Sequence, residues 1–236
     1  MKQSTPKSAS GAEPQGDKPA VPAATVILLR DTPEGLATLM LRRNSKLEFA
    51  GGMWVFPGGR VDPADRRDAA DDEMAVARVA AAREAQEESG LLVAPEAMLT
   101  FSHWMPPAIS PKRFSTWFFA AEASTETVTI DDGEIKAHAW MRPADALQRR
   151  DDGEIELTPP TWVTLHELRE WPDVQAALRG IAARTPEHFT TRVARGGQRP
   201  MALWHGDAGY EDGDVERSGP RHRLSMGPSP WRYQRG

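Results

Sequence analysis

The chain has no cysteine among its 236 residues, which excludes several kinds of site at once. No disulfide, no thiolate-bound zinc and no cysteine nucleophile can form. The sequence also lacks any apolar run of about 18 residues, the length that a membrane-spanning helix requires. Its first residues carry no apolar segment of the kind found in signal peptides. We therefore expect a cytoplasmic protein that has no membrane partner.

Positive charge is also in short supply. The chain carries 29 lysines and arginines against 34 aspartates and glutamates, a formal net charge of −5. Because non-specific nucleic-acid binding depends on positive surface, we expect no nucleic-acid partner. The hydrophobic content of 39% and the charged content of 27% are typical of a globular protein. The sequence is compatible with a homodimer but does not decide the oligomeric state.

Composition divides the chain into three parts. Residues 1–22 are rich in proline, small residues and scattered charge, so they are expected to form a disordered tail. Residues 23–185 alternate apolar strand patterns with helical ones and are expected to form the main domain. Residues 186–236 contain tryptophan-bearing strand patterns between stretches rich in glycine and arginine, which predicts a small, partly β appendage packed on that domain.

The individual elements follow from apolar patterns and turn residues. Strands are predicted at 24–30, 36–41, 98–104, 113–120 and 135–141, and in the appendage at 201–204, 222–226 and 231–233. Helices are predicted at 71–89, 143–148, 159–169 and 172–183, the first of them stopped by Gly90. Mixed strands and helices in this order predict an α/β fold in which helices cover a mixed sheet.

The most informative stretch runs from Arg83 to Leu91. Glu84, Glu87 and Glu88 share one face of a helix, where like charges repel unless a cation lies among them. Mg²⁺ and Mn²⁺ prefer such oxygen ligands and often bind carboxylates together with substrate phosphates. The run therefore indicates a metal-dependent phosphate chemistry. The alternative is a solvated acidic face on a surface helix.

A second motif, Trp54 to Gly59, favours the metal site. It is a short apolar run that ends in Pro57-Gly58-Gly59, where glycine lets the backbone approach a ligand closely. Together the two motifs resemble the Nudix box, whose second half reads R-E-U-x-E-E-x-G-U with U aliphatic. Ala85 lies at the first aliphatic position.

The resemblance to the Nudix family implies a fold, a chemistry and a set of roles. The implied fold is an α/β/α sandwich with a mixed sheet, and the implied reaction is hydrolysis of a diphosphate in a small nucleotide-type substrate. Glu84, Glu87 and Glu88 would be ligands of Mg²⁺ or Mn²⁺. Arg83 would offset the acidic cluster and hold the helix against the turn, and Gly58 and Gly59 would lie against the substrate or a metal.

One departure from the family pattern is an insertion at about residues 61–70. Family spacing would put a glycine at Ala69 and, at Ala75, the glutamate that supports the arginine. Asp72 or Glu73 is expected to replace that glutamate. The role of the insertion stays open.

An insertion here resembles the coenzyme A and acyl-CoA diphosphatase branch of the family. The motif that this branch carries before the box is matched at Leu39, Arg43, Gly52 and Phe56 to Gly59, and is not matched at Met40, Leu41, Asn44 and Glu48. In this interpretation Arg42 and Arg43 reach the 3′-phosphate of coenzyme A, and Arg113 and Phe114 border the substrate. A basic residue at position 48 would also suit a phosphate, and Glu48 departs from that.

Glu134 follows a turn and is expected to be a further metal ligand or a base, with Asp131 and Asp132 as rivals. The preferred products are a phosphopantetheine derivative and adenosine 3′,5′-bisphosphate. One alternative is a hydrolase of NADH, ADP-ribose or an oxidised nucleotide. Another is a non-catalytic ligand sensor, although such a protein is expected to have lost box carboxylates, and all three are present.

Overall fold

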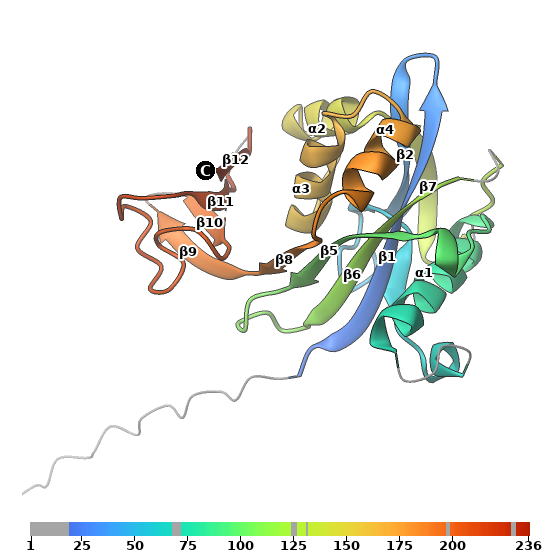
Figure 1. Ribbon diagram of the computed structural model, residues 1–236, viewed down its shortest axis with the longest axis horizontal. Coiled ribbons are helices and arrows are strands. Elements are labelled where there is room, and N and C mark those ends of the chain that lie inside the picture. Colours follow the sequence, from blue (N-terminus) through green and yellow to red (C-terminus); the bar gives the residue numbers. More distant parts are fainter. Residues whose placement is uncertain (1–18, 68–71, 124–126, 131, 197–198, 228–229) are drawn as a thin grey trace, which may run out of the picture.

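The computed structural model describes residues 19–67, 72–123, 127–130, 132–196, 199–227 and 230–236. A mixed sheet forms the centre, in the order β3-β2-β1-β6-β5-β8, with β4 also paired to β1 and β7 to β2 (Figure 1). Its strands are β1 (Val21–Thr32), β2 (Gly35–Arg43), β3 (Trp54–Val55), β4 (Gly58–Arg60), β5 (Leu99–Met105), β6 (Phe114–Glu122), β7 (Ile135–Met141) and β8 (Glu187–Thr190).

Strand β1 lies in the middle of this sheet, and both of its faces are buried. It pairs in parallel with β6 and antiparallel with β2 and β4. Val26 and Leu28 pack in the core on one side, and Ile27 and Leu29 pack in the core on the other. An apolar run without polar alternation is what a strand covered on both faces requires.

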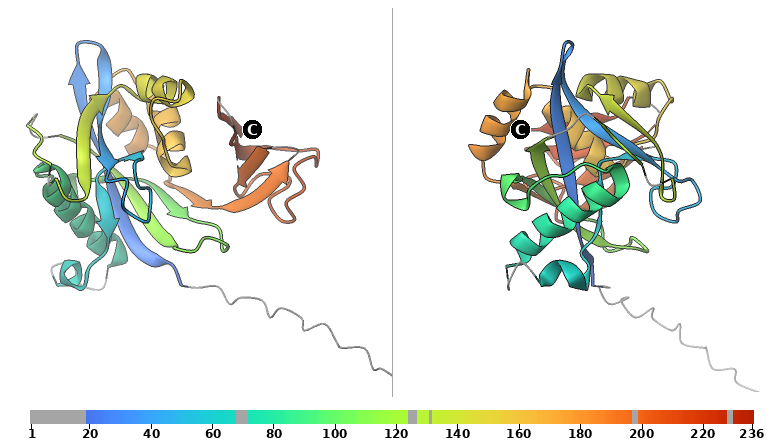
Figure 2. Two further views of the ribbon diagram at one scale, coloured as in Figure 1. Left: turned by 180° about the vertical axis from the view of Figure 1, so that it is seen from behind. Right: turned by 90° about the vertical axis from the view of Figure 1, so that its right-hand side faces the viewer.

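Helices cover the two faces unequally. One face carries α1 (Glu73–Ser89), and the other carries α2 (Pro143–Asp151), α3 (Pro159–Leu168) and α4 (Val174–Ala182), as Figure 2 shows from two sides. Helix α1 begins where Asp72 accepts a hydrogen bond from the Met74 N–H and ends at Gly90, whose φ is 71°. Buried alanines such as Ala77, Ala80 and Ala81 let α1 lie close to β1. The predicted α/β/α sandwich is confirmed.

Two short 3₁₀ helices complete the main body: η1 (Pro63–Arg66), in the insertion, and η2 (Pro95–Ala97), before β5. The appendage is a second, antiparallel sheet in the order β12-β11-β10-β9. Its strands are β9 (Arg192–Gly196), β10 (Arg199–Leu203), β11 (His222–Ser225) and β12 (Arg232–Arg235).

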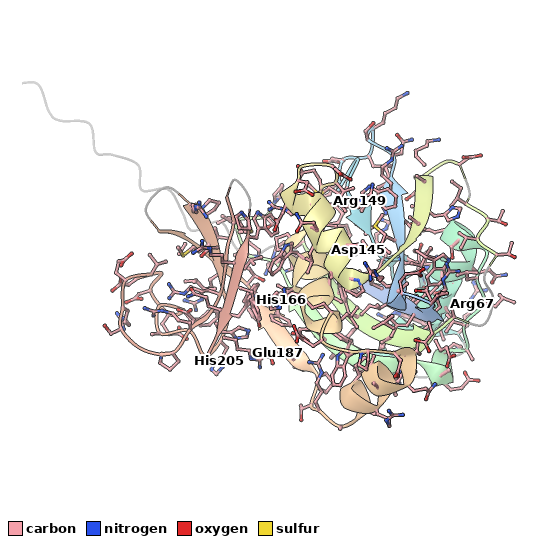
Figure 3. All side chains as sticks on the ribbon, turned by 90° about the horizontal axis from the view of Figure 1, so that it is seen from above. Arg67, Asp145, Arg149, His166, Glu187 and His205 are labelled. Atoms are coloured by element: carbon pink, nitrogen blue, oxygen red, sulfur yellow. The ribbon has the colours of Figure 1, made fainter. Side chains whose placement is uncertain are left out.

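The appendage shares a core with the main body. The indole of Trp104 stacks on Phe189 at 3.9 Å between ring centroids and meets Trp204 edge-on at 5.7 Å. Figure 3 places His166 and Glu187 on the side that faces the appendage, whereas Arg67 of the insertion lies at the opposite end. The small β appendage expected from the tryptophans is therefore present and packed on the domain.

Several elements begin or end at other residues than the sequence analysis expects. Strand β8 lies beyond the boundary expected at residue 185 and pairs in parallel with β5, so the main sheet extends to residue 190. Helix α1 begins at Glu73 rather than at Asp71, which lies outside the described residues, as does most of the tail expected to be disordered. Within the described parts of the chain, no helix has the length and apolar character needed to cross a membrane.

A buried ion pair fixes the loop that covers the outer face of the appendage. Asp207 accepts hydrogen bonds from Arg223 Nε and Nη2, both at 2.6 Å, and from the N–H of Gly209 and of His222. Burial alone would raise the pKa of Asp207, but the hydrogen bonds from Arg223 and the two N–H groups lower it to about 2. The pair therefore stabilises the fold wherever Asp207 is ionised.

We predict that Asp207→Asn lowers the free energy of unfolding by about 3 kcal/mol at pH 7, because it leaves Arg223 buried without its counter-charge. The unfolded carboxyl titrates near its usual pKa and the folded one near 2, so the loss shrinks as pH falls from about 4 to 2. Urea unfolding followed by tryptophan fluorescence measures both effects. Asp212→Asn, in an exposed pair with Arg217, is the control, and an equal loss there would contradict the prediction.

Candidate active site

The site forms where the Gly58-Gly59 turn meets the second half of α1. The Gly58 N–H donates a hydrogen bond to Glu88 Oε2 at 2.9 Å. A Cβ atom on Gly59 would lie 2.3 Å from Glu84 Oε1, and one on Gly58 would lie 2.5 Å from the Ala24 carbonyl oxygen. Gly58 therefore needs glycine because the backbone of β1 approaches too closely for any side chain, and Gly59 leaves room for the Glu84 carboxylate.

Two of the three box carboxylates are largely withdrawn from solvent. The Glu88 side chain is 7% exposed and that of Glu84 is 15% exposed. Burial, with smaller contributions from the charges of Glu84 and Glu134, raises the pKa of Glu88 to about 8 against the opposing effects of Gly58 and Arg43. Burial also raises the pKa of Glu84, although Arg83 opposes the shift. Arg83 and Arg43 do not fully offset the burial of the two carboxylates, and a divalent cation would supply the further positive charge that favours their ionised forms.

Arg83 is the hub of the site. Its Nη1 donates to Glu84 Oε1 and to Glu87 Oε2, each at 3.0 Å. Its Nε and Nη2 donate to the two carboxylate oxygens of Asp65, at 2.9 and 3.1 Å. The hydrogen bonds to Asp65, followed by the charge of Glu84, raise the pKa of Arg83, so the guanidinium stays charged.

The sequence analysis expected Asp72 or Glu73 to support Arg83, and that expectation is wrong. Asp72 instead caps α1, and Glu73 is exposed at its first turn. Asp65, in η1 of the insertion, is 3% exposed and takes the place beside Arg83. The sequence analysis missed it because it counted the family spacing back from Arg83, whereas the same pattern counted forward from Gly59 leads across five residues to Asp65.

Arg43 links Glu134, an acid from outside the box, to the cluster of box glutamates. Its guanidinium lies 3.1 Å from Glu134 Oε2 and 3.6 Å from Glu88 Oε1. The structure thus brings together Glu134 from the turn before β7, Arg43 from β2 and Glu88 from α1. Asp131, a rival for Glu134, lies outside the described residues, and no hydrogen bond or ion pair joins Asp132 to Glu88 in the described part.

The other proposed substrate contacts lie away from this cluster. Arg42 is exposed, next to a β-bulge in the pairing of β2 with β7. Phe114 meets Phe49 edge-on at 5.2 Å between ring centroids. The Arg113 carbonyl oxygen accepts a hydrogen bond from the Val21 N–H at the start of β1. The Phe49–Phe114 contact joins the loop after β2 to the start of β6, and the Arg113 contact joins the residue before β6 to β1.

The residues present suit a hard divalent cation in chemistry, but they are not preassembled around one. Glu84, Glu87 and Glu88 offer only oxygen donors, as Mg²⁺ and Mn²⁺ prefer. Within the described residues, no three acidic or histidine side chains converge at the spacing of a ready metal site. Glu87 is 58% exposed and, like Glu84, is bound to Arg83.

A separate cavity of about 70 Å³ lies beneath the insertion. None of the box glutamates borders it, so it is distinct from the carboxylate cluster. Its lining residues are Pro22, Ala23, Val61, Arg66, Glu73, Val76, Ala77, Ser115 and Trp117.

The family assignment follows from comparison with known proteins. The sequence profile described as NUDIX domain matches residues 19–161, more than half of the chain. The chain therefore belongs to the Nudix family.

Two relatives match over part of their length. The protein named nudix hydrolase 7 of Caenorhabditis elegans is 26% identical over 187 residues, which is 64% of this chain and 61% of that protein. The acyl-coenzyme A diphosphatase NUDT19 of Xenopus laevis is 27% identical over 96 residues, 39% of this chain and 25% of that protein. The chain thus spans less than two thirds of the length of each.

Solved structures support the fold. A NUDIX hydrolase from Alicyclobacillus acidocaldarius superposes with a TM-score of 0.62 at 24% identity, covering 68% of this chain and 96% of that one. The NUDIX domain of Shewanella oneidensis NrtR, solved with ADP-ribose, superposes with a TM-score of 0.50 at 16% identity, covering 68% of this chain and 94% of that one. At these identities the likeness concerns the fold alone.

We predict that Glu88→Gln raises the free energy of unfolding of the metal-free protein by about 1 kcal/mol at pH 7.5. Glutamine still accepts the Gly58 hydrogen bond, and it removes the cost that Glu88 carries on folding, which is either a buried charge beside Glu84 or the uptake of a proton. Because burial raises the pKa of Glu88 to about 8, wild-type stability should fall between pH 4.5 and 8, and the variant should lack this slope. Thermal unfolding in EDTA measures it, with exposed Glu87→Gln as control. A destabilised Glu88→Gln protein would contradict the prediction.

Proposed function

We propose that this protein is a metal-dependent hydrolase that cleaves the P–O–P bridge of a small nucleotide-type substrate. The observation that carries the proposal is the pair of buried carboxylates, Glu84 and Glu88, held against the Gly58-Gly59 turn beside Arg83. Membership of the Nudix family supports the same chemistry. A diphosphate is anionic, so a site built from carboxylates can approach it only with bound cations.

The roles of the residues follow from their positions. Glu84, Glu87 and Glu88 would hold Mg²⁺ or Mn²⁺, which when bound acidifies water and neutralises the diphosphate. Glu88 is anchored by the Gly58 N–H, so its free oxygen has a defined direction. Arg83 keeps Glu84 and Glu87 oriented from behind and does not itself contact the substrate. Water then attacks one phosphorus, and the bridging oxygen leaves with the other phosphate.

Arg43 and Glu134 would complete the site. Arg43 lies beside Glu88, so it is better placed to meet the diphosphate than a remote 3′-phosphate. Glu134 is 60% exposed and held by Arg43, so it can turn toward a water molecule as a base or toward a metal as a ligand. Arg42, Arg113 and Phe114 would lie further out along the substrate.

Coenzyme A or an acyl-CoA is our preferred substrate. The match to the upstream motif at Leu39, Arg43, Gly52 and Phe56 to Gly59 supports it, as does the partial similarity to an acyl-coenzyme A diphosphatase. The products would be a phosphopantetheine derivative and adenosine 3′,5′-bisphosphate.

A second candidate is a hydrolase of NADH, ADP-ribose or an oxidised nucleotide. The observation that favours it is the ion pair between Glu48 and Lys112, because an acid at position 48 neutralises a lysine that would otherwise attract the 3′-phosphate. The ADP-ribose complex of the NrtR domain is a further reason to include this ligand in a test.

The substrate proposal is tested by a product assay. The protein is incubated with coenzyme A, acetyl-CoA, a long-chain acyl-CoA, 3′-dephospho-CoA, NADH and ADP-ribose, each with Mg²⁺ or Mn²⁺, and the products are identified by mass. We expect adenosine 3′,5′-bisphosphate from the CoA substrates alone. Equal cleavage of 3′-dephospho-CoA, or preferred cleavage of ADP-ribose, would favour the second candidate. Cleavage of nothing by folded, metal-loaded protein would favour a ligand sensor.

The site residues are tested on whichever substrate is cleaved. Glu88→Gln should lower kcat by about 1,000-fold, since loss of a ligand charge removes about 4 kcal/mol of transition-state stabilisation. Glu134→Gln should lower kcat by about 100-fold as a base would. Asp132→Asn, in the same turn, is the matched control and should stay within about twofold. Wild-type turnover by folded Glu88→Gln would refute the metal assignment.

A further inference from the structure

Arg30 is a half-buried cation on the face of the main sheet that carries α1. Along β1 it lies two residues after Leu28, which packs in the core beneath α1, so both side chains point to that face. The guanidinium carbon of Arg30 lies 4.2 Å from the centroid of the Trp140 ring, which packs against the same core from β7. Both side chains are half-buried, so an ion from the solvent can reach them.

Each member of this pair has a buried N–H group without an acceptor. Arg30 Nε and Trp140 Nε1 are both buried, and neither has a hydrogen-bond partner in the part of the chain that the structure describes. A buried donor that bonds to nothing costs free energy, so such groups are normally satisfied by protein, by water or by a bound ion. Here the two unsatisfied donors belong to side chains in contact, which places the need for an acceptor at one site.

The neighbouring acids do not offset the charge of Arg30. The carboxylate of Asp31, the next residue of β1, accepts a hydrogen bond from the Val174 N–H. The carboxylate of Glu122, at the end of β6, accepts one from the Gln175 side chain. Among the described residues Arg30 forms no ion pair, so its positive charge is available to an anion.

A second arginine–tryptophan contact in this chain shows what the first one lacks. The guanidinium carbon of Arg150 lies 4.1 Å from the centroid of the Trp231 ring, a very similar distance. In that pair Arg150 Nη1 donates to the Asp151 carboxylate at 3.0 Å, and Trp231 Nε1 donates to the Gly227 carbonyl oxygen at 3.2 Å. The contact between β1 and β7 has neither the acid nor the acceptor for its indole.

We propose that Arg30 and Trp140 form a binding site for a phosphate group, either free or part of a phosphomonoester. A guanidinium has five N–H groups and an indole has one, which favours an anion with more oxygens than the two of a carboxylate. The site is separate from the carboxylate cluster. Trp140 lies five residues, or about 16 Å, along β7 from Ile135, the residue that pairs with Arg43. The inference does not depend on the proposed function.

The test follows the indole N–H signals of isotope-labelled, full-length protein by NMR, in EDTA so that no divalent ion is bound. The chain has eight tryptophans, and the signal missing from Trp140→Phe identifies Trp140. We expect sodium phosphate to shift this signal until it saturates, and sodium chloride at equal ionic strength to leave it in place. Trp162 is the internal control, because its buried N–H also lacks a partner but no arginine of the described residues stacks on its ring.

Variants test the contribution of the arginine. Arg30→Gln should raise the Kd for phosphate by about 10- to 100-fold, since charge-assisted hydrogen bonds to the anion are lost. Arg30→Lys keeps the charge but loses the planar guanidinium, so it should raise the Kd less. Arg150→Gln is the matched control for an arginine on a tryptophan, and Arg43→Gln removes the proposed diphosphate contact. Both should leave the Kd unchanged.

Further ligands identify the source of the phosphate and the outcomes that would overturn the inference. AMP binding more tightly than inorganic phosphate, with adenosine inert, would point to a nucleotide, and equal binding of both would point to the free ion. Acetate bound as tightly as phosphate would overturn the phosphate assignment. A Trp140 signal that phosphate does not shift, or a Kd that Arg30→Gln does not change, would overturn the site. The wild-type titration decides the matter even if Arg30→Gln does not fold.

Discussion

Two carboxylates buried side by side, Glu84 and Glu88, set the constraint on which the rest of this site depends. Their burial raises both pKa values, that of Glu88 to about 8, so the polypeptide alone favours the uncharged form of Glu88, and a bound cation would favour the ionised form. The neighbouring residues contact the two carboxylates in ways that make their burial possible. Gly58 donates an N–H to Glu88, Gly59 leaves room for Glu84, and two arginines, Arg43 and Arg83, approach without closing the site. Buried carboxylates with raised pKa values are typical of catalytic centres.

The scaffold can hold such a site because it is stabilised elsewhere. Helix α1 lies against β1 through alanines, while the opposite face of the sheet has the larger aromatic core, which continues into the appendage through Trp104, Phe189 and Trp204. The appendage lies at the far end from the insertion, as Arg67 and Glu187 show in Figure 3. Its buried Asp207–Arg223 pair therefore acts on stability without entering the chemistry.

Residues that act through local spacing could be predicted from the sequence, and residues that act through the tertiary fold could not. The helical period alone brings Glu84, Glu87 and Glu88 to one face, and the glycine pair marks a close approach. Asp65 also lies at a family spacing, separated from Gly59 by five residues, but the extra residues between it and Arg83 break the spacing that is counted back from the arginine. Strand β8 was missed for another reason: Glu187 and His188 hide an apolar pattern in which only Phe189 is buried.

The charges around the outer loops bear on which substrate fits. Glu48 pairs with Lys112, and beside them Phe49 meets Phe114, so this rim offers a neutral ion pair and aromatic edges. A phosphate that reached the rim would have to displace Glu48 from Lys112, and an exposed pair of this kind contributes no more than about 1 kcal/mol. The pair therefore weakens selection for a 3′-phosphate without forbidding it. Nearer the carboxylates, Arg43 lies 3.6 Å from Glu88 Oε1, so under the proposed function it would meet the diphosphate that all the candidate substrates share and would not select for a 3′-phosphate.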